Sequence, residues 1–238
     1  MQEAQAKNYL RENLAEVARK IEQAANKVGR NANEIKLIAV SKTHPIEILQ
    51  AAINVGATVF GENKVQEAEG KIEAIGREKV EWHLIGHLQK NKARKAVQIF
   101  DVIHTLDSIE LARRLERICK EEQRESLSVL AQVDLANEAT KNGVAENDLP
   151  QLIEFLQTCD CLKLTGLMII PPFFEDAENV RPYFRRLREL RDKILPNGEL
   201  SMGMSHDFPI AIEEGATLVR VGTAIFGERK YLTTDAQR

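Results

Sequence analysis

The stretch IKLIAVSKTHPIEILQAAINVGATVF, residues 35–60, indicates the fold class because it holds one complete strand–helix–strand unit. An apolar run at residues 35–41 predicts a strand, and a second run at residues 57–60 predicts the next one. Between the two runs, apolar side chains recur with the helical period, at Ile46, Leu49, Ala52 and Ile53. This order predicts a βα unit whose helix leads to the next strand of a parallel sheet.

The same unit recurs along the rest of the chain. Apolar runs predict eight strands, at residues 35–41, 57–60, 82–86, 102–106, 127–133, 162–170, 200–204 and 218–221. Strands rich in Val, Ile and Leu on both faces indicate a parallel sheet covered by helices. Eight units within 238 residues favour a single α/β domain, a closed (β/α)8 barrel of the TIM type, over an open doubly wound sheet. We expect one domain over residues 1–238, with the barrel at residues 35–227.

An extra helix is expected before the barrel, at residues 1–29. Its apolar side chains form one stripe, made of Leu10, Leu14, Val17, Ile21 and Val28. The stripe is short for a coiled-coil seam, so we favour a helix docked on its own domain.

The composition is that of an ordinary soluble globular protein. The chain has 33 basic and 36 acidic side chains, so its net charge of −3 provides no broad attraction for nucleic acid or an anionic membrane. Its three cysteines form an odd set without a disulfide framework, and no stretch resembles a signal peptide or a membrane span. We therefore expect a cytoplasmic protein with no membrane or nucleic-acid partner.

Lys42 follows the first predicted strand directly, in the sequence AVSKTHP. In a parallel barrel, the strand ends and the loops after them build the active face. Partial burial favours the neutral amine of a lysine, which can attack an aldehyde and form a Schiff base. On this feature alone, a lysine that extends to water is the commoner interpretation.

The loops after strands seven and eight are candidates for phosphate binding. We expect Ser205, after Gly203 and Met204, to be a helix N-cap, and Gly222 with Thr223 to open a helical turn. Backbone N–H groups at helix starts bind phosphate, and TIM barrels commonly use these two loops. Taken alone, each loop is more often a plain capped helix, and it is their joint placement after strands seven and eight that favours phosphate binding. Neither matches the GxGxxG or Walker pattern, so no dinucleotide or nucleoside triphosphate is indicated.

His83 and His87 raise the question of a metal site. If one strand runs through both, they lie roughly 13 Å apart along it, too far for one ion. We therefore expect no metal. The basic stretches at residues 90–95 and 181–191 are interpreted as solvated helix faces.

Five segments occur in the order seen in the pyridoxal phosphate homeostasis protein family: AVSKTHP, FGENKVQEA, WHLIGHLQKNK, LSMGMSHDFPIAI and GATLVRVGTAIFG. The chain resembles this family over nearly its whole length. The resemblance implies a single barrel similar to the N-terminal domain of alanine racemase. It also implies that the protein carries pyridoxal 5′-phosphate (PLP) on a lysine, without an established catalytic turnover.

The resemblance further implies which residues bind the cofactor. Lys42 would form the Schiff base, or internal aldimine, and Arg220 would face the ring nitrogen or the phosphate. Ser205, Gly222 and Thr223 would hold the phosphate. The other positions implied near the cofactor are Asn63, His83, Met168, Gly203 and Met204. Because a guanidinium keeps its proton, Arg220 at the ring nitrogen would leave that nitrogen unprotonated and the ring a weak electron sink.

Two functions are consistent with these residues. The first is a PLP carrier without strong turnover that buffers PLP or delivers it, with apo PLP-dependent enzymes or a regulatory protein as its expected partners. The alternative is a PLP-dependent amino-acid racemase, which needs a second acid/base group that in the racemase is a tyrosine from a further β-domain. Only 11 residues follow Gly227, and the tyrosines are Tyr9, Tyr183 and Tyr231. We therefore expect the carrier function in a monomer or weak dimer, although a dimer partner could supply the missing group.

Overall fold

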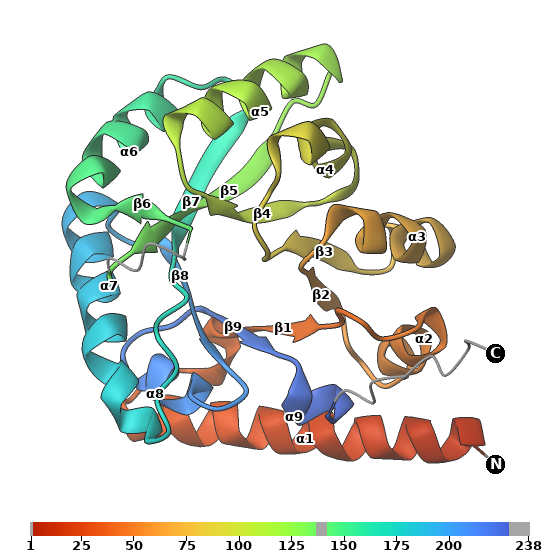
Figure 1. Ribbon diagram of the computed structural model, residues 1–238. Helices are drawn as coiled ribbons and strands as arrows, with labels where there is room; N and C mark the ends of the chain where they lie inside the picture. Colours follow the sequence, from red (N-terminus) through yellow and green to blue (C-terminus); the bar gives the residue numbers. More distant parts are fainter. Residues whose placement is uncertain (1, 137–141, 229–238) are drawn as a thin grey trace, which may run out of the picture.

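The strands close into a parallel barrel (Figure 1), in a computed structural model that describes residues 2–136 and 142–228. Neighbouring strands are parallel throughout, and the β4–β5 and β1–β9 pairings close the ring. The barrel strands are β1 (Lys36–Val40), β2 (Val59–Glu62), β3 (Glu81–Leu84), β4 (Val102–Leu106), β5 (Leu127–Asp134), β7 (Leu162–Met168), β8 (Glu199–Met204) and β9 (Leu218–Val221). The predicted TIM-type barrel is confirmed.

Helices surround the barrel (Figure 1). They are α1 (Gln2–Lys27), α2 (Ile46–Asn54), α3 (Val65–Ile75), α4 (Ala93–Ile99), α5 (Ile109–Glu121), α6 (Leu149–Gln157), α7 (Arg181–Ile194), α8 (Phe208–Glu213) and α9 (Thr223–Phe226). Short 3₁₀ turns lie at Ala32–Glu34, Lys90–Lys92, Glu146–Asp148 and Ala177–Val180. Because helices cover one face of each strand and the barrel interior the other, β4 is buried at all five positions. This double burial explains the continuous apolar runs in the sequence.

The extra helix α1 docks on its own barrel, as predicted. It lies along α8, α9 and α2 (Figure 1), and its Leu10, Val17 and Ile21 side chains are buried. Val28 departs from the predicted stripe, because α1 ends at Lys27 and Val28 is 42% exposed. The helix stops here because Gly29 has a φ of +69°, a left-handed conformation typical of helix C-termini.

Some predicted strand ends are wrong by a few residues. β2 begins two residues later than expected and continues through the charged Glu62, which an apolar run does not include. β3 ends at Leu84 rather than residue 86. β7 ends at Met168, two residues early, ahead of the Pro171–Pro172 pair that lacks backbone donors for a strand. A two-residue strand, β6 (Val144–Ala145), pairs with the end of β5 and was not predicted.

The barrel interior contains both an apolar cluster and a group of polar side chains. The apolar cluster takes one residue from each of six strands, and its members are Ile38, Val59, Val102, Leu130, Met168 and Leu218. The polar group includes His104 of β4, whose Nδ1 lies 2.9 Å from the Ser201 Oγ of β8. Since β4 and β8 are not adjacent in the sheet, this contact crosses the interior of the barrel.

Candidate active site

The backbone before Lys42 is held by a buried set of charged and polar groups. Ser41 follows β1 and is fully buried, and its Oγ donates a hydrogen bond to Glu62 Oε1 at 2.6 Å. The Lys71 Nζ donates to the Ser41 carbonyl at 2.8 Å and to Glu62 Oε1 at 2.7 Å. Burial raises the pKa of Glu62, against the opposing effect of the Lys71 ammonium. This arrangement fixes the residue that immediately precedes the half-buried Lys42.

The backbone after Lys42 is connected to Lys71 through Glu67. The Thr43 N–H donates to Glu67 Oε1, which also accepts a hydrogen bond from Lys71 Nζ at 2.6 Å. Partial burial raises the pKa of Glu67, but these two hydrogen bonds outweigh it and leave the pKa lowered. Thr43 has a φ of +68°, an uncommon conformation for a β-branched residue that its surroundings must stabilise. We call Glu62, Glu67 and Lys71 the lysine-loop triad.

Sequence analysis missed the lysine-loop triad. The only local signal is the spacing of Glu67 and Lys71, four residues apart on α3, which favours an ion pair on one helix face. Nothing in the sequence shows that this face contacts the loop after β1.

The loops after β8 and β9 meet at Ser205. Its Oγ accepts hydrogen bonds from the N–H groups of Gly222 at 3.1 Å and Ala224 at 3.4 Å. The prediction that Ser205 is the N-cap of the helix after β8 is wrong, because α8 begins at Phe208 and its N-cap is Asp207. The Asp207 side chain instead accepts a hydrogen bond from the Met204 N–H at 2.7 Å. Ser205 therefore serves the start of α9, a contact between segments that sequence spacing does not show.

This pair of loops lies beside the end of β1. A Cβ on Gly222 would lie 3.3 Å from the carbonyl oxygen of Val40, two residues before Lys42, so only a small residue allows this approach. Among the described residues, the Thr223 N–H makes no hydrogen bond. The Ser205 hydroxyl and the Thr223 N–H are donors for an anion such as phosphate. Gly222 and Thr223 open α9, as predicted.

Gly203 and Met204 have other surroundings. Gly203 has a φ of +90°, and a Cβ there would lie 2.6 Å from the Ala211 Cβ, so the glycine lets α8 pack against β8. Met204 is 36% exposed. Their roles toward a cofactor remain predictions.

Arg220 lies inside the barrel on β9 and is 3% exposed. Its Nη1 donates to Ser201 Oγ at 2.6 Å, and its Nη2 donates to the Ile169 carbonyl at 2.9 Å. Burial lowers the pKa of Arg220 to about 10, so the guanidinium stays charged at neutral pH. Its predicted contact with a ring nitrogen or a phosphate remains a prediction.

The three other predicted residues occupy different places. Met168 is fully buried in the apolar cluster of the barrel interior. His83 is 1% exposed, and its Nδ1 lies 2.7 Å from His104 Nε2. Asn63 follows β2 and approaches the loop after β3 closely, because a Cβ on Gly86 would lie 2.3 Å from the Asn63 carbonyl oxygen.

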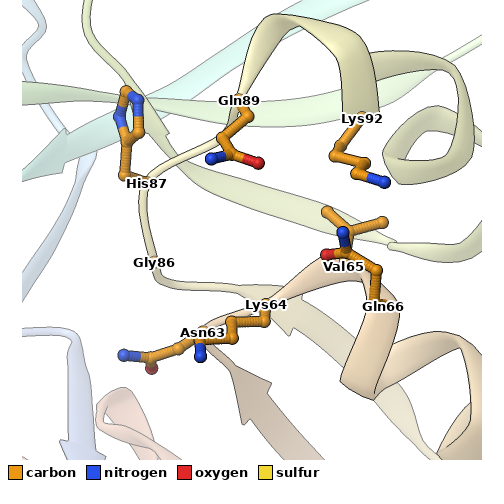
Figure 2. Close-up of a pocket in the computed structure, with 8 residues that line it drawn as sticks. All are labelled: Asn63, Lys64, Val65, Gln66, Gly86, His87, Gln89 and Lys92. Atoms are coloured by element: carbon orange, nitrogen blue, oxygen red, sulfur yellow. The ribbon is translucent and has the colours of Figure 1, made fainter.

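Asn63 also lines a pocket of about 440 Å³ between the loops that follow β2 and β3 (Figure 2). Figure 2 shows Gln89 and Lys92 on one side of this pocket and Asn63 with Lys64 on the other. Its lining contains no carboxylate, and its full set is Asn63, Lys64, Val65, Gln66, Gly86, His87, Gln89 and Lys92. Sequence analysis did not single out this pocket, because its residues come from two separate segments, one after β2 that includes the start of α3 and one after β3.

The structure gives no support to a metal site at the histidines. His87 lies beyond β3 rather than within it, and its Nδ1 is 3.5 Å from Asp107 Oδ2. Within residues 2–136 and 142–228, no group of three or more His, Cys, Asp or Glu side chains is placed to hold a metal ion. In the same residues, no helix is both long enough and apolar enough to cross a membrane.

Charges of the basic stretch on α7 are paired with acidic side chains. Arg181, Arg185 and Arg188 all form ion pairs with Glu214, and Arg181 also pairs with Glu213. These arginines are therefore occupied by ion pairs within the protein, and the interpretation of the stretch as a solvated helix face stays a prediction.

Neither tyrosine of the described residues lies inside the barrel. Tyr9 is on α1, 49% exposed, with its hydroxyl beside Gly227. Tyr183 is on α7, where its ring contacts Phe174. Tyr231 lies outside the described residues.

The protein is a closed parallel barrel with a lysine in the loop after β1 and with two loops, after β8 and β9, that meet at Ser205. Comparison with known proteins shows which class of barrel this is. The profile of the family described as "Alanine racemase, N-terminal domain" matches residues 13–230. Alanine racemase of Corynebacterium glutamicum has the same fold, with a TM-score of 0.69 over 95% of this chain and 62% of its own, at 19% identity.

Relatives with higher sequence identity show which family within this class the chain belongs to. The pyridoxal phosphate homeostasis protein of Aquifex aeolicus is 45% identical over 92% of this chain and 98% of its own length. That of Escherichia coli is 40% identical over 94% and 98%. The chain therefore belongs to the pyridoxal phosphate homeostasis protein family, which confirms the resemblance. PipY of Synechococcus elongatus, solved with PLP bound, has a TM-score of 0.80 at 39% identity and covers 92% of this chain and 100% of its own.

Proposed function

We propose that this protein binds PLP covalently through Lys42 and takes part in intracellular PLP homeostasis, as a carrier in the cytoplasm rather than as a strong catalyst. One observation carries the proposal. The loop of Lys42, which the lysine-loop triad holds, follows β1, and the loop that contacts Ser205 follows the adjacent strand β9, where Gly222 approaches Val40. The names of the curated relatives and the PLP bound to PipY support it.

The residues present fit PLP at both of its ends. PLP supplies an aldehyde that a lysine amine can bind and an electron-withdrawing ring. The Lys42 amine would hold the aldehyde carbon, while the Ser205 hydroxyl and the Thr223 N–H would donate to the phosphate. Arg220 would donate to the ring nitrogen. Because its guanidinium remains protonated, the ring nitrogen would stay unprotonated and the ring a weak electron sink.

Strong racemase activity is disfavoured by the same site. Racemisation needs two acid/base groups on opposite faces of the bound substrate. Lys42 offers one, whereas Tyr9 and Tyr183 lie on the outer helices. The racemase-like enzyme remains the alternative function, in which a dimer partner would supply the second group.

We expect Ser205→Ala to weaken PLP binding. The variant removes a hydroxyl that would donate to the phosphate and that also orders the start of α9. A hydrogen bond to a charged group contributes about 1.5–3 kcal/mol, so the PLP dissociation constant should rise at least tenfold, as measured by equilibrium dialysis. The control is Thr158→Ala, which removes an exposed hydroxyl at the C-terminal end of α6. Equal affinity of the Ser205 variant and the control would contradict the assignment.

The carrier function itself is tested with PLP-loaded protein and a panel of L- and D-amino acids. We expect no steady racemisation or keto-acid formation. Typical enzymes turn over about ten times per second, and sustained turnover within a few orders of magnitude of that rate would instead support the enzyme. In parallel, an apo PLP enzyme is added and its recovered activity is followed. Recovery faster than with the same concentration of free PLP supports direct delivery, whereas recovery limited by free PLP leaves buffering as the function.

A further inference from the structure

Five polar side chains form a connected series through the barrel interior: Arg220, Ser201, His104, His83 and Glu81. We call this series the interior chain. Arg220 Nη1 lies 2.6 Å from Ser201 Oγ, which lies 2.9 Å from His104 Nδ1. His104 Nε2 lies 2.7 Å from His83 Nδ1, and His83 Nε2 lies 3.0 Å from Glu81 Oε1. Four strands, β9, β8, β4 and β3, thus contribute to it.

The direction of the first hydrogen bonds follows from what each group can donate. A guanidinium only donates, so Ser201 Oγ must accept from Arg220. Ser201 is fully buried, and among the described residues the only other hydrogen-bond partner of its Oγ is His104 Nδ1. A buried hydroxyl without an acceptor is costly, so Ser201 donates to His104 Nδ1. His104 Nδ1 therefore carries no proton.

The next bond follows from the first. A neutral imidazole with a bare Nδ1 carries its proton on Nε2, so His104 donates to His83 Nδ1. His83 then accepts at Nδ1 and carries its proton on Nε2, which faces the Glu81 carboxylate. Among the described residues His83 Nε2 has no hydrogen-bond partner, so this last pair has contact distance without hydrogen-bond alignment. It is the weakest link of the interior chain.

The far end of the interior chain agrees with this direction. The His83 ring and the Lys36 ammonium, which lies 3.0 Å from Glu81 Oε2, lower the pKa of Glu81 to about 2. The carboxylate is therefore ionised at neutral pH. An unprotonated His83 Nε2 would place a lone pair 3.0 Å from this anion, so the proton belongs on Nε2.

The charges around His104 favour its neutral form. Burial lowers the pKa of His104 well below the usual range, and Arg220 and Lys36 add positive charge from two other strands. Glu81 is the carboxylate at the other end of the interior chain, and Asp207 is a buried carboxyl that interacts with Arg220. A neutral His104 can keep Nδ1 as an acceptor for Ser201.

We propose that Ser201 and His104 are positioning residues that hold the Arg220 guanidinium in one orientation for the ring of the ligand, with His104 fixed as its Nε2–H tautomer. The inference rests on the proposed function only in naming PLP as that ligand. His104 orients the Ser201 hydroxyl, and Ser201 together with the Ile169 carbonyl restricts the rotation of Arg220. Arg220 is thus held by one residue inside the barrel, Ser201, and by one that directly follows β7, Ile169.

The first test needs no PLP. In ¹⁵N-labelled protein at neutral pH, NMR should show both histidine rings neutral and protonated at Nε2. The two Nη groups of Arg220 should give separate signals in the wild type, because each has its own acceptor, and averaged signals in Ser201→Ala. A proton on His104 Nδ1, or Arg220 signals that Ser201→Ala leaves unchanged, would overturn the proposal.

The second test measures the effect on PLP. His104→Leu removes the acceptor, whereas His104→Asn keeps an amide near the Nδ1 position that can accept from Ser201. We expect the PLP dissociation constant to rise about tenfold in Ser201→Ala and His104→Leu and by less than threefold in His104→Asn. Leu130→Ala, which opens a cavity in the apolar cluster of the same interior and removes no polar group, controls for destabilisation.

The two tests separate the possible failures. If wild-type protein binds no PLP, the proposed function fails, while the NMR signals still decide the interior chain. If the wild type binds PLP and Ser201→Ala binds it no more weakly than Leu130→Ala does, the positioning role is wrong.

Discussion

Lys42→Ala is expected to abolish all covalent retention of PLP while leaving the fold intact. The side chain lies in the loop after β1, so its removal leaves the buried Ser41–Glu62–Lys71 contacts in place. The visible absorbance of the PLP-loaded protein should disappear after gel filtration. Borohydride treatment followed by peptide mapping should label the peptide with Lys42 in the wild type and no peptide in the variant.

The matched control is Lys64→Ala. Lys64 is an exposed lysine that lines the pocket beside Asn63, so it is the alternative amine in the neighbouring loop (Figure 2). We expect this variant to retain PLP as the wild type does. Labelling of Lys64 or Lys92 in the wild type would show that the covalent bond forms in the pocket and not at Lys42.

The fold could be predicted from the sequence because a parallel strand that is buried on both faces has an apolar run in its sequence. β4 and β9 have the expected bounds for this reason. The ends of other strands were less accessible. Glu62 belongs to β2 because Lys71 and Ser41 compensate its charge there, and no local pattern shows that compensation.

The site was accessible only in part. Lys42, Gly222 and Thr223 follow strands directly, so the rule that active residues follow parallel strands was enough to single them out. The lysine-loop triad and the interior chain depend on contacts such as His104 with Ser201, which are 97 residues apart. The sequence pointed to the loop of Ser205 but assigned this residue to the start of α8. Its hydrogen-bond partners are at the start of α9, 17 and 19 residues away, a distance that no local pattern shows.

Lys71→Met is expected to cause the largest loss of stability. Removing one partner of a buried ion pair costs about 3–5 kcal/mol, because the other charge stays buried without compensation. Lys71 and Glu62 have side-chain exposures of 6% and 0%, and the Glu62 Oε2 atom has no hydrogen-bond partner among the described residues. The free energy of unfolding, measured with urea at pH 7, should fall by about 3 kcal/mol or more.

The pH dependence of this loss gives a sharper test. Burial already raises the pKa of Glu62, and without the Lys71 ammonium it should rise further. The folded variant then binds a proton that the unfolded chain releases, so its stability is retained below the unfolded pKa and lost as pH rises through the folded pKa. The difference from wild type should therefore grow from pH 5 to pH 8.

Two further variants separate the buried charge from lost packing. Glu62→Gln/Lys71→Met removes both charges, so it should be more stable than Lys71→Met alone at pH 8 and should lack its added pH dependence. Lys20→Ala, which removes an exposed ion pair with Glu16, should change stability by less than about 1 kcal/mol. If Lys71→Met and the double variant were equally unstable at every pH, the role of Lys71 would be packing, and its charge would not explain how the Lys42 loop is held.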